Sequence, residues 1–278
     1  MELTSIQDLI EKRLQSSSKS MAEDEAKNFF KLFNIPVVAE KKVTDDTMIL
    51  EACRKTGFPV VLKGICENIL HKTESGLVRV GLSSEGQVKD TVKEMKKSAK
   101  QQIDAFLVQP VISGQREFVA GMFKDPQFGP VIVFGLGGIL TEALKDVVFK
   151  IAPLKDVDIE DMFEQLSSKK LLSDFRGEKS VNKEAVKKIL KGLSDIALAF
   201  PNIKEIDINP LMIQPDGSPV AVDGLIVLEE IKKEETKSYD IDLNILGSCY
   251  YPKSIAFIGA SASPGKWGHM LLTNTLSR

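Results

Sequence analysis

Short apolar runs rich in β-branched residues alternate with amphipathic stretches along most of this chain, and this alternation constrains the fold most. Residues 22–33 place three phenylalanines and an alanine at helical spacing before Pro36 ends the helix. The same period recurs over residues 86–97, 158–166 and 182–200. The pattern predicts an α/β (α+β) protein whose helices bury one apolar face. Between the last two helices, residues 167–180 are polar, and we expect this segment to be mobile.

Several apolar runs between the helices predict strands. Residues 106–111 and 116–121 are expected to pair as neighbouring strands around Ser113-Gly114. Residues 128–134 form a further strand that enters a glycine turn at 135–138, where backbone amides can face a phosphate or an acyl phosphate. Glycine clusters also simply make tight turns, so this segment alone does not establish a phosphate site.

Asn209 and Asp223 lie fourteen positions apart, each in a short β-branched run. The Pro215-Asp216-Gly217 segment between them favours a turn that folds the two runs back as a hairpin, which would bring the two side chains together. Mg²⁺ takes carboxylate or amide oxygens from a protein and completes its octahedron with water and substrate phosphates. The pair therefore predicts a platform for a nucleotide and Mg²⁺, although Asn and Asp are also common near turns that bind no metal.

Lys63 ends the apolar run 58–63 and is followed at once by Gly64, so its ammonium group is well placed to reach an anion. Residues 68–76 then form a polar loop with His71, a second lysine and two hydroxyl side chains. Such a loop can hold phosphate. A histidine beside a lysine in a loop is also a common surface arrangement, and that alternative stays open at this point.

The order of these motifs resembles one family. Lys63, the His71-Lys72-Thr73-Glu74-x-Gly76 loop, the glycine turn, Asp207-x-Asn209-Pro210 and Asp223 follow one another as in the ATP-grasp subunit of ADP-forming acyl-CoA synthetases. That group is typified by the acetate enzyme and is related to succinyl-CoA synthetase. The resemblance covers about residues 20–230 and rests on the motifs jointly, because no single one would suffice.

The resemblance implies an ATP-grasp fold over residues 1–230, with subdomains at about 20–105 and 106–230. It implies that the chain binds ATP or ADP, with Lys63 countering the phosphate charge and with Mg²⁺ held by Asn209 and Asp223.

The same resemblance places Gln109 and Val111 at the segment that holds adenine, and Glu117 at the acid that holds ribose. Each assignment has a structural alternative. Gln109 could instead satisfy a neighbouring backbone group, and Glu117 could interact with solvent or with a neighbouring strand.

The family reaction converts an acid, CoA and ATP into acyl-CoA, ADP and phosphate, through an acyl phosphate and a phosphohistidine. The resemblance assigns phosphoryl acceptance to His71, because neutral imidazole is a nucleophile at about pH 7. Glu142, Asp146 and Asp207 are further candidates for the catalytic site. The dipole of a helix also attracts acids to its first turn, and Asp207 stands where succinyl-CoA synthetase has the longer Glu.

The last part of the chain has a different character. Residues 231–252 form a charged linker, and residues 253–278 resemble the start of a CoA-binding, Rossmann-like domain, truncated after one βα unit. Such a domain needs about 100 residues. We therefore expect either a fragment of a longer fused polypeptide or a stub that docks on the main domain or a partner. The expected partners are a CoA-binding, alpha-type domain or subunit and a small carboxylic acid, with the complete enzyme an oligomer.

Composition excludes several classes of protein. A formal net charge of −2 and a pI of 5.9 lack the basic excess of nucleic-acid-binding surfaces. No apolar run reaches the roughly 18–20 residues of a membrane span, and the first residues lack a signal-peptide pattern, so we expect a cytoplasmic protein. Three cysteines without metal-ligand or redox spacing are expected to be reduced thiols. A noncatalytic ATP-binding module and another ATP-grasp carboxylate ligase stay open as alternative functions.

Overall fold

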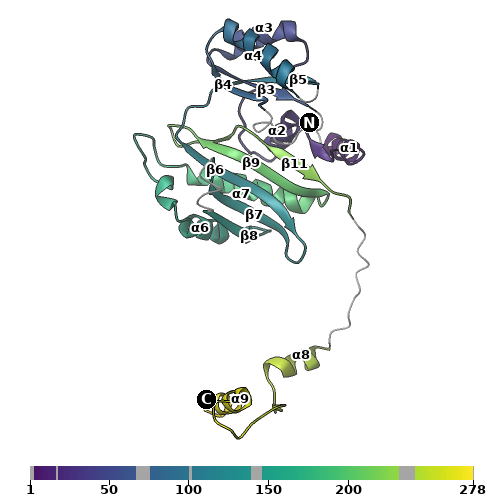
Figure 1. The fold of residues 1–278 in the computed structure, drawn as a ribbon, viewed down its shortest axis with the longest axis vertical. Helices are drawn as coiled ribbons and strands as arrows, with labels where there is room; N and C mark the ends of the chain where they lie inside the picture. Colours follow the sequence, from purple (N-terminus) through teal and green to yellow (C-terminus); the bar gives the residue numbers. More distant parts are fainter. Residues whose placement is uncertain are drawn as a thin grey trace. The chain divides into compact units, whose positions relative to one another are not determined.

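The computed structural model describes residues 3–16, 18–66, 76–99, 102–138, 146–231 and 242–277. Two compact units make up the chain, Met1–Ile231 and Lys232–Arg278 (Figure 1). His71 and Glu142, both predicted as catalytic residues, lie outside the described residues.

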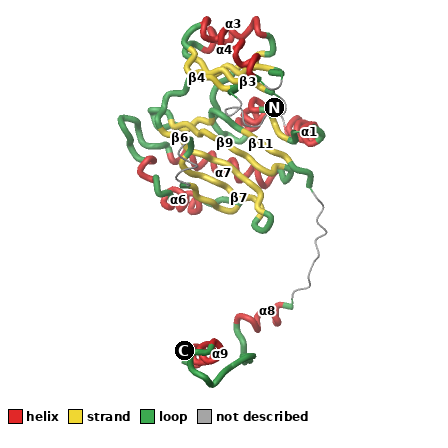
Figure 2. The backbone as a smooth tube through the Cα atoms, viewed as in Figure 1, coloured by secondary structure: helices red, strands yellow, loops and turns green. Residues whose placement is uncertain are grey.

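A four-stranded antiparallel sheet forms the smaller part of the first unit, in the order β2-β5-β3-β4. Its strands are β2 (Lys41–Val43), β3 (Val60–Ile65), β4 (Val78–Leu82) and β5 (Ala105–Pro110). The sheet is covered by α3 (Ile49–Thr56), which follows the short η1 helix (Asp46–Met48), and by α4 (Glu85–Ser98) (Figure 2). Buried apolar side chains of α3 and α4 pack on β3 and β5, as the amphipathic pattern of residues 86–97 predicts.

A seven-stranded sheet forms the larger part, in the order β1-β11-β9-β6-β7-β8, with β10 paired to β9. Its strands are β1 (Ser20–Met21), β6 (Arg116–Asp125), β7 (Gly129–Leu136), β8 (Val147–Ile151), β9 (Ile203–Ile213), β10 (Pro219–Ala221) and β11 (Leu225–Leu228). The helices of this part are α1 (Leu3–Leu14), α2 (Glu23–Leu32), α6 (Asp156–Gln165) and α7 (Lys183–Ala199). The expected helices over 22–33, 158–166 and 182–200 are thus confirmed to within two residues at each end.

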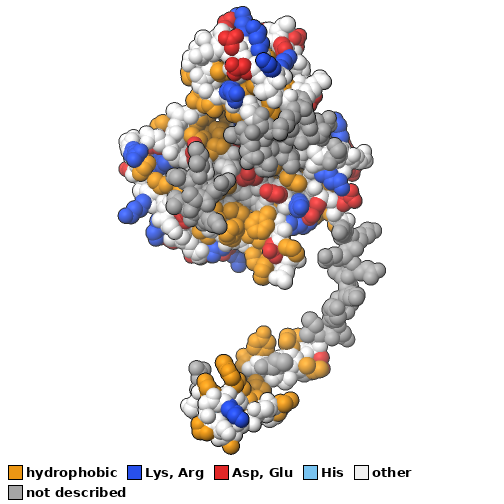
Figure 3. Space-filling view, viewed as in Figure 1, with side chains coloured by type: hydrophobic (Ala, Val, Ile, Leu, Met, Phe, Trp, Pro, Cys, Tyr) orange, Lys and Arg blue, Asp and Glu red, His pale blue; other side chains and the backbone are white. Residues whose placement is uncertain are grey.

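The main core lies between the seven-stranded sheet and the helices on one of its faces (Figure 1). Phe118 of β6 stacks on Phe134 of β7, whose ring meets Phe163 of α6 edge-on. Helix α7 buries its apolar stripe against the same sheet, because residues three and four apart share one face. The opposite face of β6 and β8 leaves Phe123 and Phe149 partly exposed, and apolar side chains gather over β7 and β8 in Figure 3.

The predicted pairing of residues 106–111 with residues 116–121 is wrong. β5 pairs with β2 and β3 in the smaller sheet, whereas β6 pairs with β7 and β9 in the larger one. Each strand finds a more extensive partner elsewhere: β5 and β3 match six residues, and β6 and β7 match eight. The Ser113-Gly114 segment is therefore a crossing between sheets and not a hairpin turn.

Residues 167–180, which were expected to be mobile, are joined to β6 by hydrogen bonds. This segment contains the η2 helix (Lys169–Leu172). The fully buried Arg116 donates from Nη1 to the carbonyls of Leu171 and Ser173, and its Nε lies 3.1 Å from Glu178 Oε2. A buried guanidinium of this kind fixes the backbone that satisfies it.

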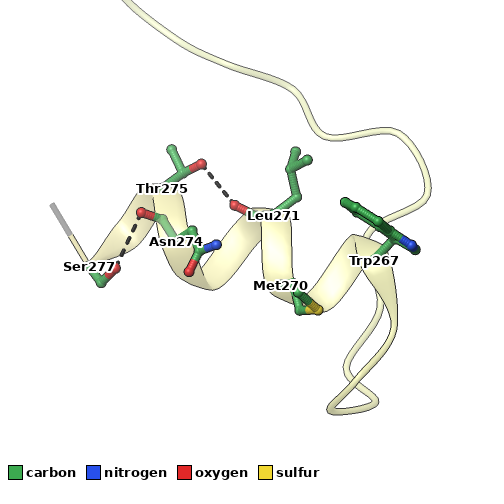
Figure 4. Close-up of a pocket in the computed structure, with 6 residues that line it drawn as sticks. All are labelled: Trp267, Met270, Leu271, Asn274, Thr275 and Ser277. Atoms are coloured by element: carbon green, nitrogen blue, oxygen red, sulfur yellow. Dashed lines mark hydrogen bonds between the residues drawn. The ribbon is translucent and has the colours of Figure 1, made fainter.

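The second unit contains α8 (Leu243–Tyr250) and α9 (Trp267–Leu276). The βα unit expected within residues 253–278 lacks its strand. Residues 255–258, its first apolar run, form none, because a strand needs a neighbour for its backbone groups, and Ile255 and Ile258 are exposed. A shallow pocket is lined by Trp267, Met270, Leu271, Asn274, Thr275 and Ser277 (Figure 4). All six belong to one helix and its C-cap, so the pocket is an open helix face. None of the described helices is long and apolar enough to cross a membrane.

Candidate functional site

The hairpin predicted between Asn209 and Asp223 is confirmed. β9 and β10 pair in antiparallel register, with Leu211 opposite Ala221, and the turn closes through the Gln214 amide and the Ser218 carbonyl. Beyond the paired residues, Val222 N donates to the Pro210 carbonyl at 3.3 Å. The backbone next to Asn209 is thereby joined to the backbone next to Asp223. Two hard oxygen donors come to the same end of the hairpin.

Lys63 reaches this end of the hairpin from the other sheet. Its side chain is nearly fully buried, and its Nζ lies 3.2 Å from Asp223 Oδ2 and donates to the Val222 carbonyl at 2.9 Å. Burial lowers the pKa of Lys63, but the carboxylates of Glu23 and Asp223 outweigh it and raise the pKa above its ordinary value. Lys63 is therefore charged, and ion pairs fix its ammonium group where the two sheets of the first unit meet.

A buried ion network surrounds Lys63, and sequence reasoning missed most of it. Glu23 Oε1 lies 2.7 Å from Lys63 Nζ and 2.6 Å from Lys27 Nζ, and Lys27 also contacts Glu40 Oε2 at 2.9 Å. Gln109 Nε2 donates to both carboxylates, at 3.1 Å to Glu23 and 2.8 Å to Glu40. The side chain of Gln109 is thus part of the ion network, while its proposed role beside adenine concerns the segment 109–111.

A signal for this network was present in the sequence. Glu23 and Lys27 are four residues apart in α2, and they fall on the helical stripe that continues through the buried Phe30. A carboxylate and an ammonium aligned with an apolar face are expected to be buried together, because each would be costly to bury alone. This signal is easily missed, because acidic residues are also common in the first turn of a solvated helix, where they interact with the helix dipole.

Glu117 lies on β6 against the glycine turn that follows β7. Its carbonyl accepts from Gly137 N at 2.8 Å, and a Cβ on Gly138 would lie 2.4 Å from Glu117 Oε2. Gly138 also has a φ of +71°, which side-chain-bearing residues rarely adopt. The positive φ favours glycine here, whereas the end of the flexible Glu117 side chain could shift to make room for a Cβ. The sequence indicates the glycine turn at 135–138 and Glu117 as separate candidates. In the structure the two are hydrogen-bonded neighbours.

Other predicted residues take different positions. Asp207 is half-buried in β9, opposite Gly121 of β6 and Leu225 of β11. Asp146 accepts from the amides of Ser167 and Ser168 at 2.9 and 2.7 Å. Burial raises the pKa of Asp146, but these hydrogen bonds outweigh it and lower that pKa below its ordinary value. In this structure Asp146 therefore holds the start of the segment 167–180.

Asn209 and Asp223 fit a magnesium ion by the chemistry of their donors. Asn209 is exposed and the Asp223 side chain is 31% exposed, so both oxygens can be reached from solvent and leave room for water and phosphate ligands. Within the described part of the chain, no cluster of three or more His, Cys, Asp or Glu side chains could hold a metal ion. A site of one carboxylate and one amide suits Mg²⁺ bound together with a phosphate better than a closed all-protein site.

Comparison with known proteins places this arrangement in a family. Residues 12–228 match the family model described as the ATP-grasp domain. The beta subunit of the ADP-forming acetate–CoA ligase I of Pyrococcus furiosus is 35% identical over 226 residues, which cover 80% of this chain and 97% of that subunit. The ADP-forming 4-hydroxybutyrate–CoA ligase of Nitrosopumilus maritimus is 34% identical over 203 residues, or 71% of this chain and 29% of that protein.

Solved structures agree with this assignment. The dinucleotide-forming acetyl-coenzyme A synthetase 1 of Ca. Korarchaeum cryptofilum, in complex with coenzyme A, Ca-AMPCP and HgCl+, has a TM-score of 0.75 and 36% identity. The match covers 80% of this chain and 99% of that chain. A complex of the same enzyme with coenzyme A and Mg-AMPPCP, its phosphohistidine segment pointing towards the nucleotide binding site, has a TM-score of 0.70 with the same identity and coverage. The chain therefore belongs to the ATP-grasp family, among the relatives of the beta subunits of ADP-forming acetate–CoA ligases.

Proposed function

We propose that this chain is the nucleotide-binding and phosphoryl-transfer part of an ADP-forming acyl-CoA synthetase, which converts an acid, CoA and ATP into acyl-CoA, ADP and phosphate. One observation carries the proposal. Lys63 of the smaller sheet lies 3.2 Å from Asp223, which follows β10 of the larger sheet at the end of the hairpin that also carries Asn209. A cation for phosphate and a pair of oxygen ligands for Mg²⁺ thus lie together in a fold whose relatives bind nucleotide analogues with Ca²⁺ or Mg²⁺.

In this proposal Asn209 and Asp223 would hold Mg²⁺, which bridges and neutralises phosphate oxygens when it is bound. Lys63 places its charge against the phosphates, and phosphoryl transfer depends mainly on such positioning and electrostatic stabilisation. Asp207, two residues before Asn209 on the same strand, is the proposed acidic residue nearest to them in sequence.

The nucleoside would lie along the crossing from β5 to β6. Gln109 and Val111 are the proposed adenine segment, and Glu117 is the proposed ribose ligand. The half-buried position of Val111 and of Glu117, at the two ends of this crossing, supports the assignment. The glycine turn against Glu117 would present backbone amides near the same ligand.

His71 is the proposed phosphoryl acceptor, and Glu142 is a further proposed catalytic residue. An imidazole nitrogen of His71 would attack the γ-phosphorus of ATP, so that a P–N bond forms, the bond to the bridging oxygen breaks and ADP leaves. The resulting phosphohistidine would deliver phosphoryl to a second site.

Beta-subunit relatives imply a partner alpha subunit. We propose that the partner is a CoA-binding, alpha-type domain or subunit, that residues 253–278 begin such a domain after the linker 231–252, and that the substrate is a small carboxylic acid. We further propose that the complete enzyme is an oligomer and lies in the cytoplasm.

Calorimetric titration of ADP and ATP, with and without Mg²⁺, tests the proposed function. The wild-type chain should bind nucleotide in a metal-dependent way, and an Asn209→Ala/Asp223→Ala variant should lose the metal-dependent part. Absence of nucleotide binding by the wild-type chain would refute the proposal.

A further inference from the structure

Three donors from three different elements converge on one oxygen of Glu23. Lys27 Nζ of α2, Lys63 Nζ of β3 and Gln109 Nε2 of β5 lie 2.6, 2.7 and 3.1 Å from Oε1. The Glu23 side chain is 1% exposed, and that of Lys27 is fully buried. An arrangement of buried charges at such short distances needs all its members, because removal of one leaves an uncompensated charge.

Lys63 has a second anionic neighbour. The two carboxylates differ in their distance from Lys63, in their exposure and in the elements that carry them. Glu23 is closer, at 2.7 Å, and buried, whereas Asp223 is at 3.2 Å with a side chain that is 31% exposed. Glu23 comes from the start of a helix, while Asp223 follows the short strand β10 and accepts from the next amide, Gly224 N, at 2.8 Å. Only Asp223 can be reached by a solvated ion.

We propose that Glu23 is a positioning residue for Lys63: it is the counter-anion that Lys63 keeps when nucleotide binds, whereas Asp223 is the counter-anion that Lys63 gives up to the metal. The inference rests on the proposed function and adds to it a residue on α2 that belongs to none of the motifs of the site. Asp223 cannot serve Lys63 and Mg²⁺ fully at once, so an anion that stays is needed to hold the ammonium group where the phosphate arrives.

The remaining members of the network explain why Glu23 can stay. Lys27 neutralises the charge that Glu23 brings into the interior, and Glu40 Oε2 in turn receives Lys27 and Gln109 at 2.9 and 2.8 Å. Without Lys27, Glu23 and Glu40 would be two buried carboxylates facing each other across Gln109, which would favour protonation of one of them. Lys27 is therefore a support for the position of Glu23 and does not itself contact Asp223 or the hairpin.

Three variants of the full chain separate positioning from simple stability. Glu23→Gln removes the charge that faces Lys63. Glu23→Gln/Lys27→Met removes one buried charge of each sign and leaves Lys63 without its helix partner. Glu25→Gln, on the same helix, removes a carboxylate that pairs with Arg13 at 2.7 Å and serves as the control. Each variant is measured for thermal unfolding, for calorimetric binding of Mg·ADP and for binding of adenosine.

The proposal predicts a split between the two ligands. Both Glu23 variants should bind Mg·ADP at least about tenfold more weakly than wild type, because Lys63 loses the charge-assisted contact that holds it where the phosphate arrives. Adenosine binding should change less than about twofold. The double variant should unfold at a lower temperature than Glu23→Gln, because Glu40 also loses its cation, but it should bind Mg·ADP no more weakly than Glu23→Gln does.

Two results would overturn the inference. If the affinity for Mg·ADP falls further in the double variant together with its stability, Glu23 has only a structural role. Equal weakening of adenosine and Mg·ADP would likewise show a general disturbance of the site. A wild-type chain that binds no Mg·ADP refutes the proposed function itself, so failure of that proposal is recognised before any variant is compared.

Discussion

Lys63 Nζ and Asp223 Oδ2 lie 3.2 Å apart, so the cation proposed for phosphate and the carboxylate proposed for the metal neutralise each other in the absence of ligand. In the proposed site, binding of a metal–nucleotide complex would replace this ion pair with two new ones. Binding of phosphate and binding of metal would then be coupled. A metal on Asp223 would free Lys63 for phosphate, and phosphate on Lys63 would free Asp223 for the metal.

Asp223→Ala should therefore have opposite effects on two forms of the same nucleotide. Metal-free ADP should bind as tightly as to wild type or more tightly, because Lys63 loses a competing anion. Mg·ADP should bind about tenfold or more weakly, because a metal ligand is lost. Calorimetry with EDTA and with excess Mg²⁺ measures both. Asp90→Ala, an exposed carboxylate on α4, is the control. Parallel weakening of both forms would contradict this coupling.

Lys63→Met should weaken Mg·ADP binding by about ten- to hundredfold, because a charge-assisted contact with phosphate is worth about 1.5–3 kcal/mol. It should also lower the unfolding temperature, since Glu23 keeps Lys27 but loses its second cation. Lys204→Met, at an exposed position on β9, should change neither quantity. Retention of wild-type affinity in Lys63→Met would remove Lys63 from the nucleotide site.

His71 is one of only two histidines in the chain, which makes labelling decisive. After incubation with Mg·ATP, acid-labile phosphate should appear in the wild-type chain and in His269→Ala but be absent from His71→Ala. His269 belongs to α9, where its Nδ1 lies 3.2 Å from the Ser261 carbonyl. Mass spectrometry of the intact chain before and after acid treatment gives the answer. Label that persists in His71→Ala would exclude His71 as the acceptor.

Arg116→Met should destabilise the chain by about 3–5 kcal/mol, because it leaves Glu178 as a buried charge without its cation. The carbonyls of Leu171, Ser173 and Lys179 lose their donor as well. Urea unfolding followed by circular dichroism measures the change. Arg116→Met/Glu178→Gln should recover part of the loss. A double variant less stable than the single variant would show that Glu178 has a separate stabilising role.

Asp146→Asn should lower the free energy of unfolding by about 1 kcal/mol at pH 7, because the hydrogen bonds from Ser167 and Ser168 prefer the charged form. The pKa of Asp146 is lowered in the folded chain from its usual 3.8, so its contribution is present above that pH and is lost as pH falls through the folded pKa. Urea unfolding at several pH values should therefore show wild type and variant converging in acid. A difference that stays constant down to about pH 2 would contradict this account.

Sequence patterns predicted the helices and the hairpin because both depend on neighbours in the chain. The spacing of apolar residues over 22–33 and 182–200, and the turn at 215–217, are local signals. The partners of β5 and β6 could not be found this way. Two adjacent runs with a short polar segment between them look like a hairpin, and only competition from distant strands such as β3 and β7 assigns them to separate sheets.

The residues of the candidate site likewise fall into two groups, those predicted from local patterns and those placed by contacts with distant segments. Lys63 ends an apolar run, and Asn209 and Asp223 lie in short β-branched runs. Their order along the chain, together with the other motifs, was enough to predict a shared role. Glu23 carried a local signal, its alignment with Lys27 and Phe30, but its contact with Lys63 joins helix α2 to strand β3 across forty residues of sequence. The position of Asp146 also depends on a distant segment, which begins at Ser167.

The first and last strands of the first unit are adjacent in its larger sheet. Ser20 and Met21 of β1 pair with Val227 and Ile226 of β11, and Leu228 N donates to the Lys19 carbonyl at 2.7 Å. A unit whose first and last strands lie side by side can be joined to other polypeptide at either end without rearrangement of its sheet. This geometry suits a module that serves as a separate subunit in one relative and as less than a third of a longer chain in another. Gene fusion and circular permutation are accordingly changes that this fold can accommodate.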